Sequence, residues 1–227
     1  MFRTLFRKKI ELPHHDENWQ VYFSRINNQK ALVIFDLNVV NVAPLKILPI
    51  VFYLIVPFEL ASEEGLPTVG SFKLINELED KIAEIKDKFA SNIMHVATIS
   101  MNSERLQMYY CNRIFDTKEF LQQIDKSFGK HLTYQIDHRE DSKWDDFFNL
   151  AHPLPFQLEM IKNKNVLRQL AEAGDNLSAR RAVFHYIKFE KDQDVIDFLE
   201  FAEANAFDLK SQQKRDNSWE ICISRLD

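Results

Sequence analysis

The side chains with the clearest potential for chemistry form an acidic cluster near the middle of the chain. Five carboxylates fall within ten residues: Asp137, Glu140, Asp141, Asp145 and Asp146. Paired carboxylates can serve acid–base or metal chemistry. Asp141 equally suits a turn or cap, however, and Asp145 and Asp146 fall in the first turn of an expected helix, where the helix dipole favours negative charge. We favour the structural role and keep an enzyme, hydrolase-like, with a site near Asp141 and Trp144 as an alternative.

Histidines give no metal or catalytic set. His14 and His15 precede Asp16 and Glu17, but adjacent histidines point in different directions and no third histidine has ligand spacing. His131 and His138 flank an expected strand and fall on opposite faces of it, and His185 alternates with apolar residues. We therefore expect the histidines to have their hydrogen-bonding needs met within the fold. We assign no catalytic, cofactor-binding or metal-binding residue.

The chain has only four glycines among 227 residues, and this count argues against nucleotide chemistry. Gly65 and Gly70 have the spacing that opens a phosphate-binding loop, but Ser71 stands where lysine is needed and Phe72 where a hydroxyl is needed. The loop would lack the groups that reach the phosphates and the metal. We expect no cofactor.

A group of aromatic and basic residues could offer a stacking surface for single-stranded RNA. Its members are Tyr109, Tyr110, Phe115, Trp144, Arg105 and Arg113. The same aromatic residues at period two are more typical of a sheet core. The net charge of −5, from 29 basic and 34 acidic residues, also disfavours a bulk nucleic-acid binder. RNA binding by this surface remains a second alternative.

The lengths of the apolar stretches and the positions of the cysteines indicate a cytoplasmic protein without membrane contact. The most apolar stretch, residues 47–58, is shorter than the roughly 20 residues of a membrane helix and contains Pro49 and Pro57. The basic start of the chain has no apolar run after it, which a signal peptide needs. Cys111 and Cys222 are far apart in apolar segments, so we expect free thiols in a reducing compartment.

The elements that would position these residues alternate between strands and helices. Period-two patterns and turn signals predict strands, which fall at about 19–24, 31–40, 48–56, 93–100, 104–111, 132–136, 183–189, 207–210 and 218–224. Apolar stripes and caps predict helices, which fall at about 71–89, 116–128, 141–150, 157–173 and 192–204. We expect Ser71 and Asp116 to cap their helices, Gly129 and Gly174 to end theirs, and the helix 157–173 to be interrupted at 163–165. The fold class is α+β, with a mostly antiparallel sheet and packed helices.

Two prolines mark the best domain boundary, in the segment His152-Pro153-Leu154-Pro155, because proline restricts itself and the residue before it. We predict a basic and polar leader over residues 1–18, an α+β domain over 19–153 and a second α+β domain over 156–227.

Short motifs in the first domain carry a family resemblance. They are Gly65-Leu66-Pro67, Leu78-Glu79, Val96-Ala97-Thr98, Arg105, Tyr109-Tyr110 and the run from Asp141 to Phe148 with Pro153. With them the domain resembles the bacterial family called domain of unknown function 695. That family has no established activity, so the resemblance implies no catalytic residue.

The second domain is similar to another family. Residues 165–177, Arg180-Arg181, the strand 183–189 and the helix through Phe198 resemble the N-terminal portion of the regulator of ribonuclease E activity B family. The resemblance implies a ferredoxin-like α+β domain that inhibits the ribonuclease by binding it. Only part of that module precedes Asp227, so we expect a free sheet edge that packs on the first domain or pairs with a second chain.

These observations favour a non-enzymatic cytoplasmic regulatory protein that acts by protein–protein interaction. The expected partner is a protein, for which a ribonuclease of RNA turnover is one candidate, or a second copy bound through the C-terminal sheet edge.

Overall fold

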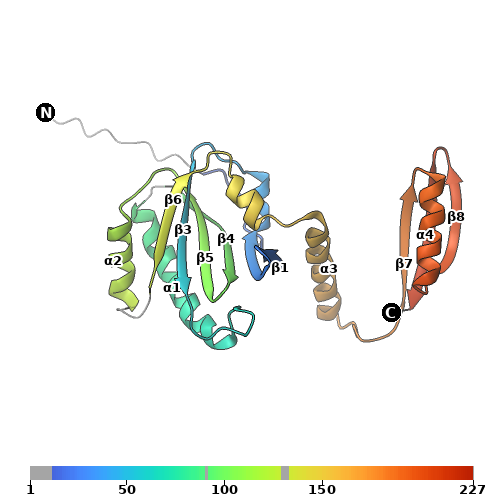
Figure 1. The fold of residues 1–227 in the computed structure, drawn as a ribbon, viewed down its shortest axis with the longest axis horizontal. Coiled ribbons are helices and arrows are strands. Elements are labelled where there is room, and N and C mark those ends of the chain that lie inside the picture. The colour runs from blue at the N-terminus through green and yellow to red at the C-terminus, as the bar shows by residue number, and fades with distance from the viewer. Residues whose placement is uncertain (1–11, 90–91, 129–132, 227) are drawn as a thin grey trace. The chain divides into compact units, whose positions relative to one another are not determined.

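The computed structural model describes residues 12–89, 92–128 and 133–226 (Figure 1). It divides into two compact units, Met1–Lys164 and Asn165–Asp227, which are described separately. The division falls inside the helix that begins at Pro155. The domain boundary expected at residues 152–155 stays a prediction. Among the described residues no helix is long and apolar enough to cross a membrane.

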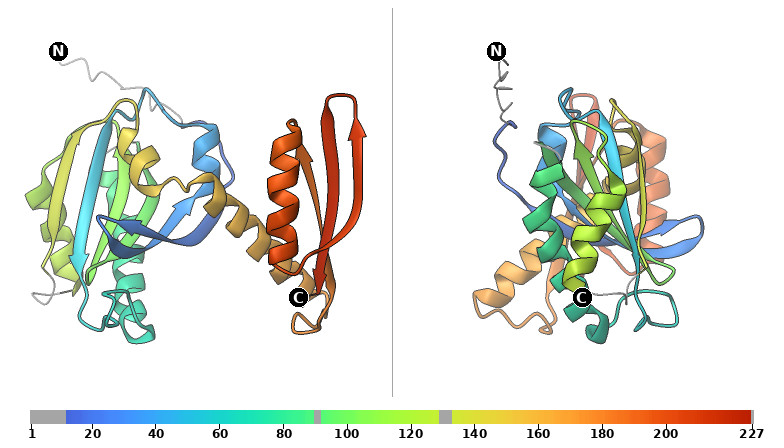
Figure 2. Two further views of the ribbon diagram at one scale, coloured as in Figure 1. Left: turned by 45° about the vertical axis from the view of Figure 1, so that its right-hand side comes forward. Right: turned by 90° about the vertical axis from the view of Figure 1, so that its left-hand side faces the viewer.

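A six-stranded antiparallel sheet is the centre of the N-terminal unit (Figures 1 and 2). The strand order is β1-β2-β4-β5-β3-β6, so β1 and β6 are the edges. The strands are β1 (Trp19–Ile26), β2 (Gln29–Asp36), β3 (Ile50–Pro57), β4 (Ile93–Met101), β5 (Glu104–Cys111) and β6 (Gln135–Glu140). The predicted α+β class is confirmed, because the unit combines this sheet with packed helices.

Two helices, α1 (Val69–Phe89) and α2 (Thr117–Phe128), cover one face of the sheet. The stripe of α1 predicted from the sequence is buried there, together with Phe120 and Ile124 of α2. Asp116 caps α2 as predicted, since its Oδ1 accepts from the backbone N–H groups of Lys118 at 2.9 Å and Glu119 at 3.2 Å. The prediction for Ser71 is wrong: α1 already begins at Val69, and the Ser71 hydroxyl donates to the Thr68 carbonyl at 2.8 Å. Gly129 lies outside the described residues.

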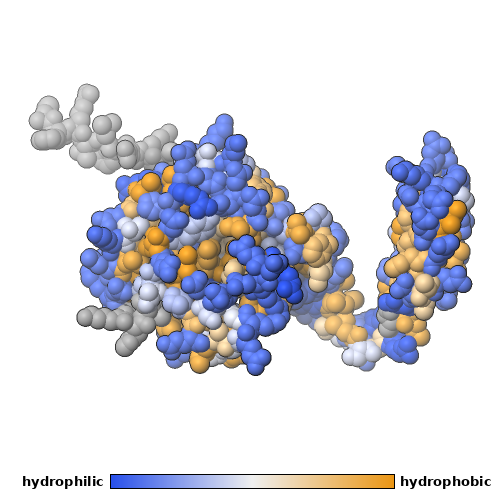
Figure 3. Space-filling model, in the orientation of Figure 1, coloured by the Kyte–Doolittle hydropathy of each residue, from blue (hydrophilic) through white to orange (hydrophobic). Residues whose placement is uncertain are grey.

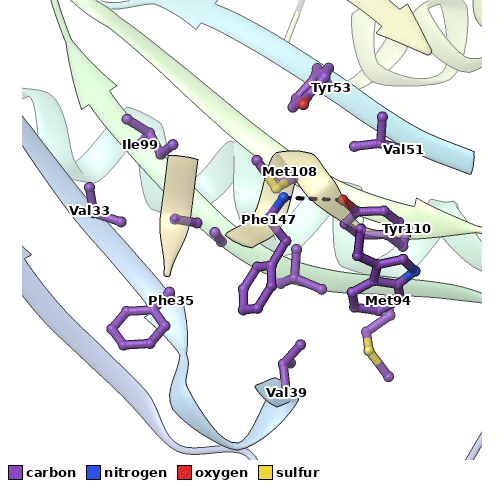
Figure 4. Packing of buried hydrophobic residues seen from close by; sticks show 14 of the residues in the cluster. Val33, Phe35, Val39, Val51, Tyr53, Met94, Ile99, Met108, Tyr110 and Phe147 are labelled. Carbon is purple, nitrogen blue, oxygen red and sulfur yellow. Dashed lines mark hydrogen bonds between the residues drawn. The ribbon is translucent and has the colours of Figure 1, made fainter. Parts of the chain in front are cut away.

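The opposite face of the sheet buries a second apolar cluster that includes Phe35, Met108 and Phe147 (Figure 4). A short 3-10 helix, Leu37–Asn41, and a π-helical turn, Phe147–Ala151, cover it, and Ile161 of α3 (Pro155–Glu172) joins it. The predicted second strand is too long, because Asp36 accepts from the backbone N–H of Asn38 at 3.0 Å and starts the 3-10 helix. The predicted interruption of α3 at 163–165 is also absent from the structure.

The motif Gly65-Leu66-Pro67 lies against the turn between β4 and β5. Asn102 and Ser103 form this turn with φ of 51° and 61°. The Ser103 backbone N–H donates to the Gly65 carbonyl at 2.9 Å. Gly65 itself has φ of 72°, and a Cβ there would lie 2.9 Å from the Asn102 Cα. Both the backbone conformation and the close approach therefore require glycine.

We expect Gly65→Ala to lower the free energy of unfolding of the N-terminal unit by about 1–3 kcal/mol, because it combines a strained φ with a backbone clash. Gly70→Ala is the matched control, since Gly70 has no positive φ. The one close approach of its new Cβ would be 2.8 Å from the Cδ1 at the end of the Leu60 side chain, which is 60% exposed and can shift. Urea unfolding of both variants checks the prediction, and equal losses would contradict it.

The C-terminal unit is a three-stranded sheet with one helix on it. Its elements are β7 (Ala182–Phe189), α4 (Asp192–Ala204), β8 (Asp208–Arg215) and β9 (Ser218–Leu226). The strand order is β7-β9-β8, and β9 is antiparallel to both neighbours. Since β7 and β8 are then parallel and joined through α4, the unit is a split β-α-β arrangement of the kind found in ferredoxin-like folds. Val195, Ala202, Ile221 and Ile223 form its core.

Candidate interaction surfaces and two buried polar clusters

The acidic residues near Asp141 organise the turn that follows β6. Both Asp141 oxygens are occupied: Oδ2 accepts from the Tyr110 hydroxyl at 2.6 Å, and Oδ1 accepts from the Asp145 backbone N–H at 2.9 Å. Oδ2 also accepts from the Asp146 backbone N–H at 3.0 Å. Burial and the bond to Asp141 raise the pKa of Tyr110, which keeps its hydroxyl protonated. Asp141 is thus a cap and an anchor for the buried tyrosine.

Trp144 is fully buried beside this cap. Its indole N–H donates to the Leu48 carbonyl at 3.0 Å, and its ring stacks on that of Tyr110 at a centroid distance of 3.9 Å. A substrate therefore has no access to the Trp144 ring, and these contacts support the structural interpretation of the motif over an enzyme site at Asp141 and Trp144.

The neighbouring carboxylate Asp146 is also paired. It accepts from the Tyr53 hydroxyl and from Nη2 of Arg139, the latter at 2.5 Å. Burial and the bond to Asp146 raise the pKa of Tyr53, and Asp146 raises the pKa of Arg139. Asp137 lies 3.8 Å from Arg139 at the exposed edge of the sheet. The acidic cluster is therefore distributed over separate pairs and does not converge on one point.

A second polar cluster lies under α1 on the other face of the sheet. The Arg105 guanidinium donates to Glu79 Oε1 from Nε at 2.7 Å and reaches it from Nη2 at 2.6 Å. Its Nη1 donates to the Ser100 hydroxyl at 3.0 Å. The Tyr109 hydroxyl donates to Gln107 Oε1 at 2.6 Å. Arg105, Ser100, Gln107 and Tyr109 are buried. The sequence motifs contain Glu79, Arg105 and Tyr109, but did not predict their pairing.

His95 extends this cluster, although no motif in the sequence marked it as a candidate. Its ring stacks on Tyr109 at 4.6 Å and contacts Trp19 at 4.9 Å. Nε2 lies 3.1 Å from the Ala97 carbonyl, which can only accept, so Nε2 carries the proton. Burial lowers the pKa of His95 to about 4. A register shift between His95 and Ala97 breaks the alternation that could have marked this residue.

We expect the N-terminal unit to lose stability in acid through His95. Because folding lowers the pKa of this group from 6.5 to about 4, the folded state resists its protonation. The contribution is complete above pH 6.5 and is lost as the pH falls toward 4, by about 2 kcal/mol at pH 5. Urea unfolding between these pH values measures the slope. His95→Phe keeps a stacking ring without the titration and should flatten the curve, whereas an unchanged slope would exclude His95 as its source.

The aromatic set considered for RNA stacking does not form one surface. Tyr109 and Tyr110 are buried on opposite faces of the sheet, and Trp144 is buried with Tyr110. Arg105 is paired with Glu79, and the Arg113 guanidinium donates to the Phe89 carbonyl at 2.8 Å. The alternative that placed RNA on this set is wrong, because burial of the rings stabilises the core and leaves no stacking platform.

The remaining histidines stay apart in the structure. His15 Nε2 lies 2.7 Å from Asp36 Oδ2, His138 is on β6, and the His185 ring contacts Phe207 in the other unit. His131 lies outside the described residues. In the part of the chain that the structure describes, no group of three or more potential ligands is arranged to hold a metal. Cys111 and Cys222 are buried free thiols.

The two outer strands of the C-terminal sheet differ in their protection against pairing. Strand β8 is exposed throughout, has a register shift between Leu209 and Ser211, and carries Lys210, Lys214 and Arg215. Charges and irregularities of this kind protect edge strands. Strand β7 pairs with β9 over its whole length without a register shift and has one charged residue, Lys188. Its outer edge therefore suits pairing with another strand.

Apolar side chains line the β7 edge on the side of α4. Phe201 is 56% exposed and lies next to Phe198, whose ring contacts Phe189 of β7 at 5.0 Å. The other flank of α4 faces β8, where Asp192 accepts from Lys214. Figure 3 shows apolar patches on the C-terminal unit between hydrophilic residues. The free edge of β7 and Phe201 together form one candidate interaction surface, called the β7 surface below.

Comparison with known proteins finds two protein families that match successive parts of the chain. Residues 17–151 match the model described as "Family of unknown function (DUF695)", and residues 160–227 match the model described as "Regulator of ribonuclease activity B". No curated protein and no solved structure matches the chain. Both resemblances predicted from the sequence are confirmed. Since the first match covers more than half of the chain, this protein belongs to the DUF695 family of unknown function and continues into a C-terminal part that matches the ribonuclease regulator family.

Proposed function

We propose that this chain is a non-enzymatic cytoplasmic regulator that binds a ribonuclease of RNA turnover, of the ribonuclease E type, through the β7 surface. The observation that carries the proposal is the contrast between the two sheet edges, since β8 is protected against pairing and β7 is not. The match of residues 160–227 to a family of ribonuclease regulators supports the choice of partner.

Strand addition would supply the binding energy. A strand of the ribonuclease that pairs with β7 gains main-chain hydrogen bonds, and alternate side chains give specificity. On the helix side, the added strand would cover Val183 and His185, and Phe201 would fill an apolar pocket of the partner. Aromatic anchors at the centre of an interface typically dominate its affinity.

A second copy of the chain is the second candidate for the same surface. In an antiparallel pairing centred on Tyr186, Val183 lies opposite Phe189 of the other copy and His185 lies opposite Ile187. This register keeps the side chains of both copies that face α4 on one side of a joined sheet, as the alternation of strands requires. A two-fold dimer of this type is self-complementary.

Two variants of the full chain test the proposal. His185→Lys places a charge within the edge strand β7, on its α4 side, and Phe201→Glu removes the apolar anchor. We expect each to weaken binding to purified ribonuclease by at least about tenfold, or about 1.4 kcal/mol, in isothermal titration calorimetry. Ile196→Lys on the opposite flank of α4, 51% exposed, is the control and should bind as the wild type does.

The outcomes separate the candidates. If neither variant changes ribonuclease binding, the β7 surface is not the contact. If sedimentation shows a dimer of the wild type that both variants dissociate, and the ribonuclease is not bound, the second copy is the partner.

A further inference from the structure

The face of the C-terminal sheet that is turned away from α4 forms a second surface, independent of the β7 surface. Cross-strand register places Tyr186 opposite Cys222 and Lys188 opposite Glu220, and Ser211 and Gln213 of β8 lie on the other side of the same β9 residues. Ile221 and Ile223 of β9 point the other way, into the core. Side chains of this outer face line a groove of about 400 Å³.

Tyr186 lines one wall of the groove, and Phe184 lies beside it on the same face of β7. Tyr186 is 81% exposed and Phe184 is 52% exposed. They are two residues apart on β7, so both side chains project from the same face and their Cα atoms are about 7 Å apart. The bottom of the groove, between Tyr186 of β7 and the residues of β8, is formed by small side chains. Cys222 of β9 is small and buried, and Ser211 of β8 is small. A planar group can therefore lie on the Tyr186 ring without meeting a large side chain.

Polar groups suited to a phosphate chain stand around the rings. Lys188 and Arg215 line the groove, with the Gln213 amide and the Ser211 hydroxyl between the strands. Arg215 Nη2 donates to Gln213 Oε1 at 3.1 Å, and its Nε lies 3.5 Å from Glu220 Oε2. The acidic residues of α4 are on the other side of the sheet: Asp192, Asp194, Asp197, Glu200 and Glu203. Among the residues that line the groove, two are cationic, Lys188 and Arg215, and one is acidic, Glu220, so the groove has a net positive charge while the helix side is acidic.

We propose that this outer face binds single-stranded RNA. Exposed aromatic rings on a sheet, with cations and amides next to them, are the usual means by which proteins hold unpaired bases and their backbone. Bases stack on Tyr186 and Phe184, Lys188 and Arg215 contact phosphates, and Ser211 and Gln213 contact base edges and the 2′-hydroxyl. The mild overall acidity of the chain limits bulk binding to nucleic acid and leaves this local site.

Fluorescence anisotropy of the full chain with a labelled oligouridine of about eight nucleotides tests the site. We expect Tyr186→Ala to weaken binding by about 5- to 150-fold, the effect of one lost stacking contact, and Tyr186→Phe to stay within about twofold of the wild type. Two phosphate contacts predict an affinity loss of about sevenfold between about 50 and about 200 mM salt. Ile196→Ala, at an exposed position of α4 outside both proposed surfaces, is the control that should not change RNA binding.

Three results would overturn the proposal. The first is that oligouridine does not bind saturably, and the second is that the wild type and Tyr186→Ala bind it with equal affinity. The third is that an RNA duplex, or a single-stranded oligodeoxynucleotide of the same length, binds as tightly as oligouridine does. If oligouridine is not bound and Tyr186→Ala instead weakens ribonuclease binding, the face is a protein contact. Because Tyr186 is mostly exposed, its replacement should leave the circular dichroism spectrum unchanged, which excludes misfolding as the cause.

Discussion

Replacement of Trp144 by alanine should lower the free energy of unfolding of the N-terminal unit by about 4 kcal/mol, within the range for truncation of a fully buried tryptophan. The ring is completely buried between the sheet and the turn after β6. Its loss would leave a cavity beside Tyr110, on which it stacks, and an unpaired Leu48 carbonyl. Trp144 also has φ of 61°, a strained conformation for a bulky residue that the packing maintains.

Hydrogen exchange of β5 amides in urea measures this effect in the N-terminal unit alone. Trp144→Phe is the matched variant: it keeps a ring on Tyr110 and loses the indole N–H, so we expect about 1–2 kcal/mol. If Trp144 were instead a substrate-binding residue, as the alternative of an enzyme site proposed, alanine would leave stability near that of the wild type. A loss below about 1 kcal/mol, the average for any substitution, would contradict the structural role.

The sequence predicted the order and type of the elements well because each carries a local signal. Helix α4 was predicted at its observed bounds, since Asp192 and Asp194 favour its first turn and apolar residues recur at helical spacing. Hairpin β4–β5 was predicted because alternating apolar runs flank a short polar turn. At Asp36 the local signal misled, because the apolar run continues to Val40 while a side-chain cap ends the strand earlier.

The candidate sites depended on contacts between distant segments, and for this reason they were harder to predict. Tyr109 and Tyr110 are neighbours in sequence, but the pleat sends one toward Glu79 and Arg105 and the other toward Asp141 and Trp144. Their shared aromatic character suggested one stacking surface, whereas the alternation of the strand separates them. The exposed rings that we assign to RNA, on β7, became recognisable only when the register showed which face α4 leaves open.

The sequence predicted a free edge in the C-terminal sheet, but not that β7 forms it. A short sheet with few strands must have two outer strands, and composition indicates how each is protected. The basic residues of β8 stand plainly in the sequence, but its register shift does not. Which strand lies in the centre follows from the pairing of β9 with both neighbours, a property of topology and not of any single segment.

Removal of the Glu79 carboxylate should have the second large effect on stability. Glu79→Ala leaves Arg105 as an unpaired charge under α1, and Arg105 is only 6% exposed against 27% for Glu79. Loss of one partner from a buried pair typically costs about 3–5 kcal/mol, and we expect about 3 kcal/mol here because Glu79 is partly hydrated. The same hydrogen exchange measurement on β5 reports it.

A matched control comes from the same helix, where Glu84 pairs with Lys81 at 2.5 Å but is 63% exposed. Glu84→Ala should leave the free energy of unfolding close to that of the wild type, because solvent screens exposed ion pairs. The double variant Glu79→Leu with Arg105→Met replaces both charges with apolar groups and should return to within about 1 kcal/mol of the wild type, because the penalty arises from the orphaned charge. If Glu79→Ala and Glu84→Ala lost equal stability, the cluster under α1 would be no more than a surface ion pair. If the double variant were as unstable as Glu79→Ala, packing and not charge would be the cause.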